Sequence, residues 1–190
     1  MTDEVETIVF ADAAAFDSWL EKNYQLQRGV WMKIAKKDSG IPSITSDEAV
    51  DVGLCWGWIS GQRRSYNESY YLQKYVPRRP KSIWSQVNVN KIANLIAKGR
   101  MKPPGLAEVN AAKADGRWDA AYVSQREATP PPDLIEALKE NKKARDFFDQ
   151  LNKTDQYMVI LKLVKERTEE GRTARLQKMI ATMTDGESVL

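Results

Sequence analysis

The stretch "WISGQRRSYNESYYLQKYVPR", residues 58–78, decides the fold class. Two runs rich in aromatic and β-branched residues flank a polar turn, "YNES", and this pattern predicts two antiparallel strands. Pro77 and Pro80 end the second strand, because proline cannot donate to a strand ladder. In "GVWMKIAKK", residues 29–37, two alternating sets of side chains predict a further, half-buried strand: Val30, Met32 and Ile34 on one side, and Trp31, Lys33 and Ala35 on the other. Together these segments predict a small antiparallel sheet.

Helical patterns surround the predicted sheet. Apolar residues at helical spacing predict a helix over about 12–24. The sequence "TSDE" is a capping box, in which Thr45 and Glu48 exchange hydrogen bonds at the start of a helix. Two more helices are predicted to pack with the sheet, over about 84–98 and 104–114.

A proline-rich linker divides the chain. The sequence "REATPPP" falls within residues 124–132, where prolines and polar residues interrupt the apolar patterns. Beyond the linker, apolar stripes predict four helices, over about 133–140, 142–151, 154–168 and 171–184. The predicted architecture is therefore α+β: a small antiparallel sheet with packed helices over residues 1–123, the linker, and an all-helical region over 133–190.

The amino-acid inventory excludes several classes of site. The chain of 190 residues contains no histidine and a single cysteine, Cys55. Without an imidazole, Ser-His-Asp and Cys-His nucleophilic sites and zinc sites built from histidine and cysteine are excluded. Acid–base chemistry would depend on carboxylates, lysines or tyrosines, and a carboxylate-only magnesium or calcium site stays possible, although no EF-hand loop or phosphate-binding GxxxxGK[ST] motif occurs. With no such motif in the sequence, we assign no catalytic residue, no metal site and no cofactor. Cys55 is interpreted as a buried small hydrophobe.

The N-terminal sequence and the cysteine usage bear on location. "MTDEVETIVF" has no basic region and no long apolar run, so we expect no signal peptide. No window approaches the roughly 20 apolar residues of a membrane span. A lone cysteine suits a reducing compartment. The expectation is a cytoplasmic protein without a membrane span.

Charge is strongly segregated along the chain. Residues 62–102 contain ten lysines and arginines but only one acid, Glu68, which gives a net charge of +9, whereas the whole chain carries +3. Residues 1–27, by contrast, contain six acids and one lysine. Because one contiguous segment carries the basic excess, we expect an anionic partner, either a small molecule or a protein.

The densest polar and aromatic group in this basic segment is "YVPRRPKSIWSQVN", residues 75–88. A helix start offers unpaired amides and a positive dipole end, and arginines bind phosphate or carboxylate in a bidentate way, so the group suits an anion site. The competing interpretation is structural: a serine caps the helix, the arginines are solvated or ion-paired, and the tryptophan is core. The candidate ligand-binding residues are Trp58, Arg63, Arg64, Arg78, Arg79, Lys81, Ser82, Trp84, Ser85 and Asn88.

Two further motifs have mainly structural interpretations. In "LCWGWISG", Gly57 allows a helix to end and a strand to begin. The flanking tryptophans are interpreted as core residues, with a stacking surface for an aromatic ligand as the alternative. In "AKADGRWDAAY", a turn with a contact between Arg117 and an aspartate explains the residues better than a carboxylate pair.

Several motifs together resemble a known family. "GVWMKIAKK", "SITSDEAVDVGLCWGWISGQRR", "YLQKYVPRRPKSIWSQVNVNKIANLIAKGRMKPPGLAEVNAAKADGRWDAAY" and "RTARLQKMIATM" are similar, in this order, to the bacterial YdeI/OmpD-associated family, also called the bacteriocin-protection family. The resemblance implies a cytoplasmic α+β protein with a C-terminal helical region, linked by name to tolerance of cationic peptides or bacteriocins and to an outer-membrane porin. It implies no catalytic residue, and it suggests a shared site at Trp58, Gly61, Arg78, Arg79, Ser82, Trp84, Ser85 and Asn88.

One position departs from the family pattern. The family usually reads WIDG where this chain has Ser60, so a role that needs the charge of that aspartate is in doubt, whereas a turn or capping role survives. From the residues and the resemblance we expect a bacterial stress-protection or binding protein with an anion site. Two alternatives are open: an enzyme acting on a phosphorylated or carboxylated small molecule, and a weak nucleic-acid binder.

Overall fold

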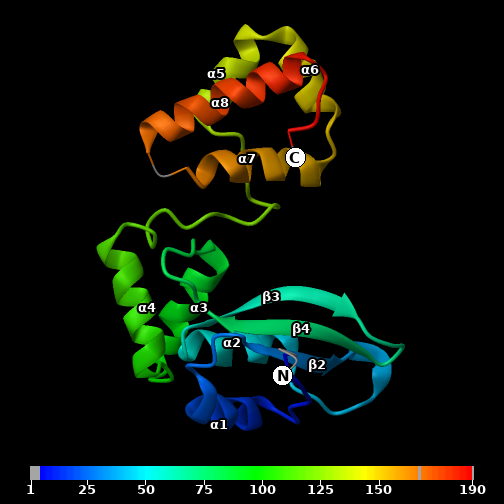
Figure 1. Cartoon of the computed structure of the whole chain (residues 1–190), viewed down its shortest axis with the longest axis vertical. Coiled ribbons are helices and arrows are strands. Elements are labelled where there is room, and N and C mark those ends of the chain that lie inside the picture. The colour runs from blue at the N-terminus through cyan, green and yellow to red at the C-terminus, as the bar shows by residue number, and fades with distance from the viewer. Residues whose placement is uncertain (1–4, 167, 190) are drawn as a thin grey trace. The chain divides into compact units, whose positions relative to one another are not determined.

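The computed structural model of the chain describes residues 5–166 and 168–189. The chain divides into two compact units, Met1–Ala121 (unit 1) and Tyr122–Leu190 (unit 2), each with its own hydrophobic core (Figure 1). The division falls close to the end predicted for the N-terminal domain at residue 123. The expected α+β class is confirmed, since unit 1 contains a sheet with helices and unit 2 is helical.

Unit 1 contains a four-stranded sheet in the order β1-β2-β4-β3. Its strands are β1 (Thr7–Ile8), β2 (Val30–Ala35), β3 (Trp58–Ser65) and β4 (Tyr70–Pro77). The predicted hairpin is confirmed, because β3 and β4 pair antiparallel, and β2 pairs antiparallel with β4. The short strand β1 is not evident from the sequence. It pairs parallel with β2, so the sheet is not purely antiparallel.

The helices described in unit 1 begin and end close to the predicted positions: α1 (Ala13–Asn23), α2 (Ser46–Cys55), α3 (Gln86–Ala97) and α4 (Pro103–Ala114), with a 3-10 turn, η1 (Lys37–Ser39). The predicted capping box is present at α2. Thr45 Oγ1 accepts from the amide of Glu48 at 3.2 Å, and the Glu48 carboxylate accepts from the amide of Thr45 at 2.9 Å. Gly57, with a φ of 76°, makes the predicted break between α2 and β3.

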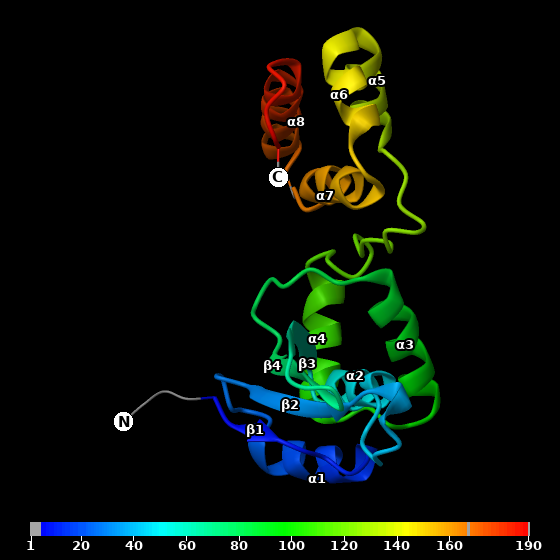
Figure 2. The same ribbon diagram turned by 90° about the vertical axis from the view of Figure 1, so that its right-hand side faces the viewer.

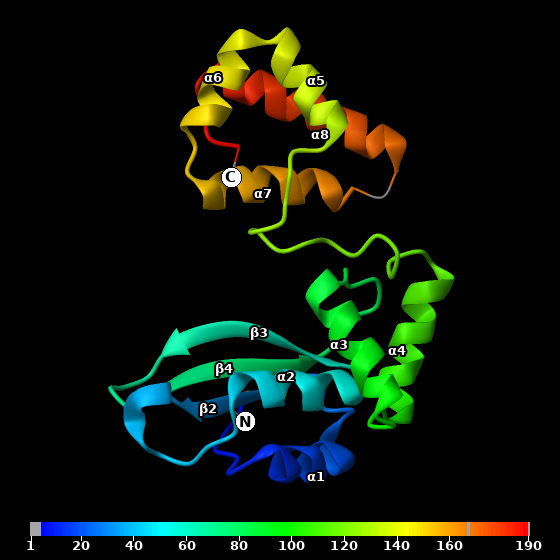
Figure 3. The same cartoon turned by 180° about the vertical axis from the view of Figure 1, so that it is seen from behind.

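The two faces of the sheet differ in what covers them. Alternate residues of β2 and β4, such as Met32 and Tyr75, lie in the core of unit 1 with Phe16 of α1. Figure 1 shows α2 behind the strands, and Figure 3, the opposite view, shows α2 in front of them. The helices described in unit 1 thus cover one face. Trp31 and Lys33 belong to the alternate set, on the face that these helices leave open.

Unit 2 is built from α5 (Pro132–Glu140), α6 (Lys142–Gln150), α7 (Lys153–Val164) and α8 (Glu169–Thr184) (Figure 2). Leu134, Phe148, Leu163 and Met183 are among the buried residues of its core. The predicted helix 154–168 ends earlier, at Val164, and its residue 167 lies outside the described residues.

Arg172 ties α8 to the start of α5. Its Nε and Nη2 donate to the two carboxylate oxygens of Asp133 at 2.7 and 2.9 Å, and its Nη1 donates to the carbonyl of Leu163 at 3.0 Å. These contacts join α5, α7 and α8. Within residues 5–166 and 168–189, no helix combines the length and the apolar character that crossing a bilayer requires.

Candidate functional site

The basic turn after β4 is organised around a buried arginine. Arg78 is 6% exposed, and its guanidinium carbon lies 3.7 Å from the centroid of the Trp84 ring. Its Nη2 donates to the carbonyl of Ile83 at 2.7 Å. Stacking on the ring and donation to a carbonyl satisfy a charge that burial would otherwise penalise. Arg78 therefore stabilises the path of the chain into α3.

A second buried arginine holds the same turn from a distant part of the sequence. Arg117 Nη1 donates to the carbonyl of Ser82 at 2.9 Å, and its Nε lies 2.8 Å from both carboxylate oxygens of Asp115. The predicted Arg–Asp contact is confirmed. The rings of Trp118 and Trp84 pack edge to face, with their centroids 5.1 Å apart. Arg78 and Arg117 thus donate to neighbouring carbonyls of one turn. Both side chains therefore stabilise the fold of this turn.

The other predicted residues of the turn take separate positions. Ser85 is the N-cap of α3, and its Oγ accepts from the amide of Asn88 at 3.3 Å, as the capping interpretation expects. Arg79 and Lys81 are exposed, and Lys81 adopts a left-handed φ of 66°. The structure thus groups Arg78, Ser82 and Trp84 inside the turn, whereas the cations open to solvent are Arg79 and Lys81. An anion site formed by all of them stays a prediction.

Three predicted or family-marked residues lie outside that turn. Trp58 is fully buried, and its indole N–H donates to the carbonyl of Tyr24 at 2.8 Å. This agrees with its interpretation as a core residue, and a role of Trp58 in a ligand site stays a prediction. Gly61 and Ser60 are exposed on β3, where Ser60 pairs with Tyr75.

Arg63 and Arg64 are neighbours on β3, and their side chains lie on opposite faces of the sheet. Arg63 makes contacts on the helix-covered side: its Nε donates to Gln73 Oε1 at 3.0 Å and its Nη2 to Ser46 Oγ at 3.3 Å. The guanidinium carbon of Arg64 instead lies 4.6 Å from the centroid of the Trp31 ring. Only Arg64 therefore belongs to the face that the helices leave open.

Cations and aromatic rings alternate across that face. Lys74 Nζ lies 5.8 Å from the Trp31 ring centroid, on the same ring as Arg64. Lys33 Nζ lies 4.5 Å from the ring centroid of Tyr66 and 4.6 Å from that of Tyr70. We call this surface the open sheet face and define it by Trp31, Lys33, Arg64, Tyr66, Tyr70 and Lys74.

The cations of the open sheet face form no ion pair among the described residues. The three long strands, β2, β3 and β4, contain Lys33, Arg63, Arg64 and Lys74 but no aspartate or glutamate. Within residues 5–166 and 168–189, Lys33, Arg64 and Lys74 form no ion pair. An anion arriving at this face would supply the missing counter-charge.

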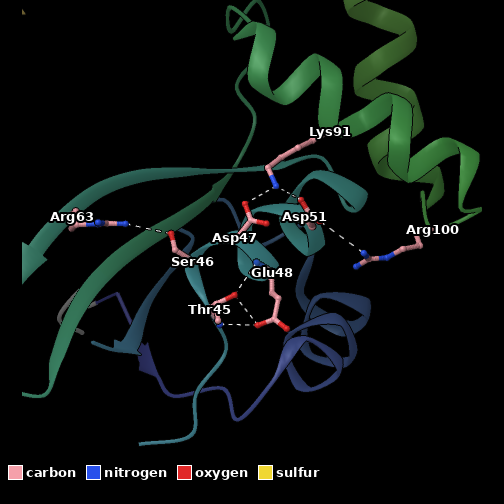
Figure 4. A network of polar contacts seen from close by, with 8 residues as sticks. All are labelled: Thr45, Ser46, Asp47, Glu48, Asp51, Arg63, Lys91 and Arg100. Atoms are coloured by element: carbon pink, nitrogen blue, oxygen red, sulfur yellow. Dashed lines mark hydrogen bonds and ion pairs between the residues drawn. The ribbon is translucent and has the colours of Figure 1, made fainter. Parts of the chain in front are cut away.

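On the helix-covered side, cations are paired with carboxylates. Figure 4 shows Lys91 of α3 between two carboxylates of α2, and its Nζ lies 2.7 Å from both Asp47 and Asp51. Arg100 approaches Asp51 at 4.0 Å. Burial opposes the charged form of Lys91, but the hydrogen bonds that Lys91 donates to the two aspartates outweigh it and raise the pKa of Lys91. These pairs join α2 to α3.

Sequence reasoning identified only Arg64 among the residues of the open sheet face. The available signal was strand alternation, which places Lys33 and Trp31 on the side away from Met32. Combining that set with the cations of the hairpin requires the register, in which Trp31 pairs with Lys74 and both Lys33 and Arg64 pair with Leu72. The sequence alone does not supply this register.

The structure also bears on the metal and cysteine expectations. No group of three or more acidic or cysteine side chains that could hold a metal ion occurs among the described residues. Cys55 is buried, and burial raises the pKa of its thiol to about 11. A thiol with so high a pKa is a poor nucleophile near neutral pH, which fits the interpretation of Cys55 as a packing residue.

Comparison with known families divides the chain in a similar way. Residues 8–108 match a domain of unknown function (DUF8412), over more than half of the chain, and residues 127–186 match the family described as bacteriocin-protection, YdeI or OmpD-associated. The recognised family is confirmed, although most of the motifs that suggested it lie within residues 8–108. The comparisons with curated proteins and with solved structures give no match. The chain belongs to the DUF8412 family, and its residues 127–186 match the YdeI/OmpD-associated, bacteriocin-protection family.

Proposed function

We propose that this chain is a binding protein and that its open sheet face takes an anionic ligand. One observation carries the proposal: the three long strands contain four cations and no carboxylate, and three of these cations lie together on one uncovered face. Guanidinium and ammonium groups bind phosphate and carboxylate oxygens directly. The ligand class is therefore one that bears phosphates or carboxylates.

The aromatic rings support this function by positioning the cations. Arg64 and Lys74 share the ring of Trp31, which is only 9% exposed, so the ring is itself fixed by its surroundings. A long side chain held against a fixed ring loses less conformational freedom when it binds a ligand. Part of the conformational entropy that binding would cost is therefore already lost in the free protein.

A protective role is part of the same proposal. The match of residues 127–186 to a family described as bacteriocin-protection supports it. Direct capture of a cationic peptide on the open sheet face is disfavoured, because like charges repel. Protection through an anionic cell component fits the charge of the face better. A cytoplasmic location stays a prediction, to be tested by cell fractionation.

The binding test uses sodium polyphosphate, a ligand that presents phosphates without rings. Isothermal titration calorimetry of the full chain should show binding that weakens as salt is added, because exposed charges are screened. The double variant Arg64→Gln/Lys74→Gln should bind at least tenfold more weakly. The matched control, Lys98→Gln/Lys143→Gln, removes two exposed cations, one directly after α3 and one in α6. It should bind polyphosphate like the wild type. Equal affinities in all three proteins would reject the proposal.

Inorganic phosphate distinguishes the open sheet face from the predicted site at the start of α3. If Arg79 and Lys81 complete a site for a single anion there, millimolar phosphate should raise the melting temperature of the wild type and not that of Arg79→Ala. If the open sheet face is the site, a single phosphate should stabilise both proteins weakly and equally. Polyphosphate binding should then be unaffected by Arg79→Ala.

A further inference from the structure

We infer that the ligand of the open sheet face is a single-stranded nucleic acid. This inference rests on the proposed function and specifies its substrate class. It is drawn from three properties of the face: the spread of its cations, the rings between them, and its position on the surface of a sheet.

The cations come from three neighbouring strands, an arrangement that suits an extended ligand better than one small anion. In the register, Lys74 lies opposite Trp31, and two residues along the strand Leu72 is flanked by Lys33 on one side and Arg64 on the other. Neighbouring strands are about 5 Å apart, and every second residue of a strand is separated by about 7 Å. This spacing suits a chain of phosphates, each contacting a different cation, as in an extended nucleic-acid strand.

The rings and the guanidinium plane offer surfaces for bases. Tyr66 is 53% exposed, and Tyr70 is partly exposed beside it. Arg64 is exposed, and its guanidinium carbon lies 4.6 Å from the centroid of the Trp31 ring, so the guanidinium is within reach of a ligand. Unstacked bases bind aromatic rings and arginine planes. A polyphosphate or a lipid headgroup has no group that would use them.

The position of the residues on a sheet favours a single strand over a duplex. The cations and rings of β2 and β4 lie on strands, and no described helix of unit 1 covers them, so nothing there projects as a groove-entering helix would. In a duplex the base faces are stacked on one another and hidden from protein rings. A single strand can lay its phosphates on the cations and its bases on the rings at the same time.

The test is fluorescence anisotropy with a labelled, mixed-sequence oligonucleotide of 12 nucleotides, as RNA and as DNA, and the full chain. Affinity should fall steeply with salt. Tyr66→Leu should weaken binding about tenfold through the loss of stacking, whereas Tyr66→Phe should keep it. Arg64→Gln should weaken binding and lower the salt slope by about one. Lys98→Gln should change neither. The same oligonucleotide as a duplex should bind more weakly than the single strand.

The outcomes separate this inference from the proposed function. If Tyr66→Leu binds the oligonucleotide like the wild type, or if the oligonucleotide binds no tighter than polyphosphate of equal charge, the inference is wrong and the anion-binding proposal stands. Tighter binding to phosphatidylglycerol vesicles than to the oligonucleotide would assign the face to a lipid surface and would also overturn the inference. Failure of polyphosphate and oligonucleotide alike overturns both. Circular dichroism of each variant verifies that a loss of binding is not a loss of fold.

Discussion

The two sides of the unit 1 sheet use positive charge in opposite ways. On the helix-covered side, Lys91 lies between Asp47 and Asp51 at 2.7 Å from each (Figure 4). On the open sheet face, Lys33 and Arg64 lie on aromatic rings and have no carboxylate partner among the described residues. Both sides draw their cations largely from one basic segment, so the difference comes from the neighbours that the fold provides.

This difference separates cations that stabilise the fold from cations that are available to a ligand. A cation paired with carboxylates or carbonyls in a partly buried place cannot be removed without leaving those groups unsatisfied. An exposed cation on a ring gains little for stability, and nearby like charges oppose it. All six tryptophans lie in unit 1, so tryptophan fluorescence reports the unfolding of this unit and can measure the difference directly.

The largest expected effect is that of removing Arg78. Arg78→Ala leaves the carbonyl of Ile83 without its donor and opens a space beside the Trp84 ring. We expect a loss of about 3 kcal/mol in the free energy of unfolding, because a buried charged hydrogen bond and its packing are lost together. Urea denaturation followed by tryptophan fluorescence measures it. Arg79→Ala, an exposed neighbour, is the control and should cost less than about 0.5 kcal/mol. Similar losses in both variants would contradict the structural role of Arg78.

The next effect is that of breaking the Lys91 pairs. The side chains of Lys91 and Asp51 are 23% and 25% exposed, so the pair is only partly screened by solvent. Lys91→Ala should cost about 1 kcal/mol, within the range of partly exposed ion pairs. A double-mutant cycle with Asp51→Ala isolates the pair from the loss of the lysine stem. A coupling energy near zero would show that the Lys91–Asp51 pair does not contribute to holding α2 against α3.

The sequence predicted most of the fold because its signals are local. The hairpin, the capping box at Thr45, the break at Gly57 and the helices of unit 2 each depend on neighbouring residues. The strand β1 escaped prediction because its two residues, Thr7 and Ile8, form a strand only through pairing with β2. The contacts divide the chain after Ala121, a few residues before the proline-rich segment 124–132 that the sequence marks as a linker.

The candidate site was less predictable because it depends on long-range register. The sequence marked the turn around Arg78 and Trp84 by its density of charge and aromatic residues. Density alone does not distinguish an arginine stacked inside a turn from one exposed to a ligand, and the partner that helps to bury the turn, Arg117, lies far along the chain. Lys33 and Lys74 join Arg64 on one face only because β4 lies between β2 and β3.

Removing the charge of Glu48 in the capping box at the start of α2 should have a smaller effect on the free energy of unfolding. The hydrogen bond from the amide of Thr45 lowers the pKa of Glu48 below its ordinary value of 4.5. A lowered pKa contributes stability above pH 4.5 that is lost as the pH falls through the folded-state value. Glu48→Gln should therefore cost about 0.5 kcal/mol at pH 7 and less at pH 3, because protonation removes the charge of the carboxylate as the pH falls. Urea denaturation at both pH values measures the difference, and an equal cost at both would contradict the role of the charge.

The smallest effect is expected on the open sheet face. The triple variant Lys33→Gln/Arg64→Gln/Lys74→Gln removes four contacts between cations and rings, each worth about 0.5 kcal/mol at an exposed site, but it also relieves the repulsion among three like charges that form no ion pair. The two effects oppose each other, so the free energy of unfolding should change by less than about 0.5 kcal/mol. Salt provides a second measurement: raising sodium chloride should stabilise the wild type more than the triple variant, because screening weakens a repulsion that only the wild type has. A loss above about 1.5 kcal/mol, or an identical response to salt, would mean that these cations serve the fold as Lys91 does. The cations of the open sheet face would then not be available to bind a ligand.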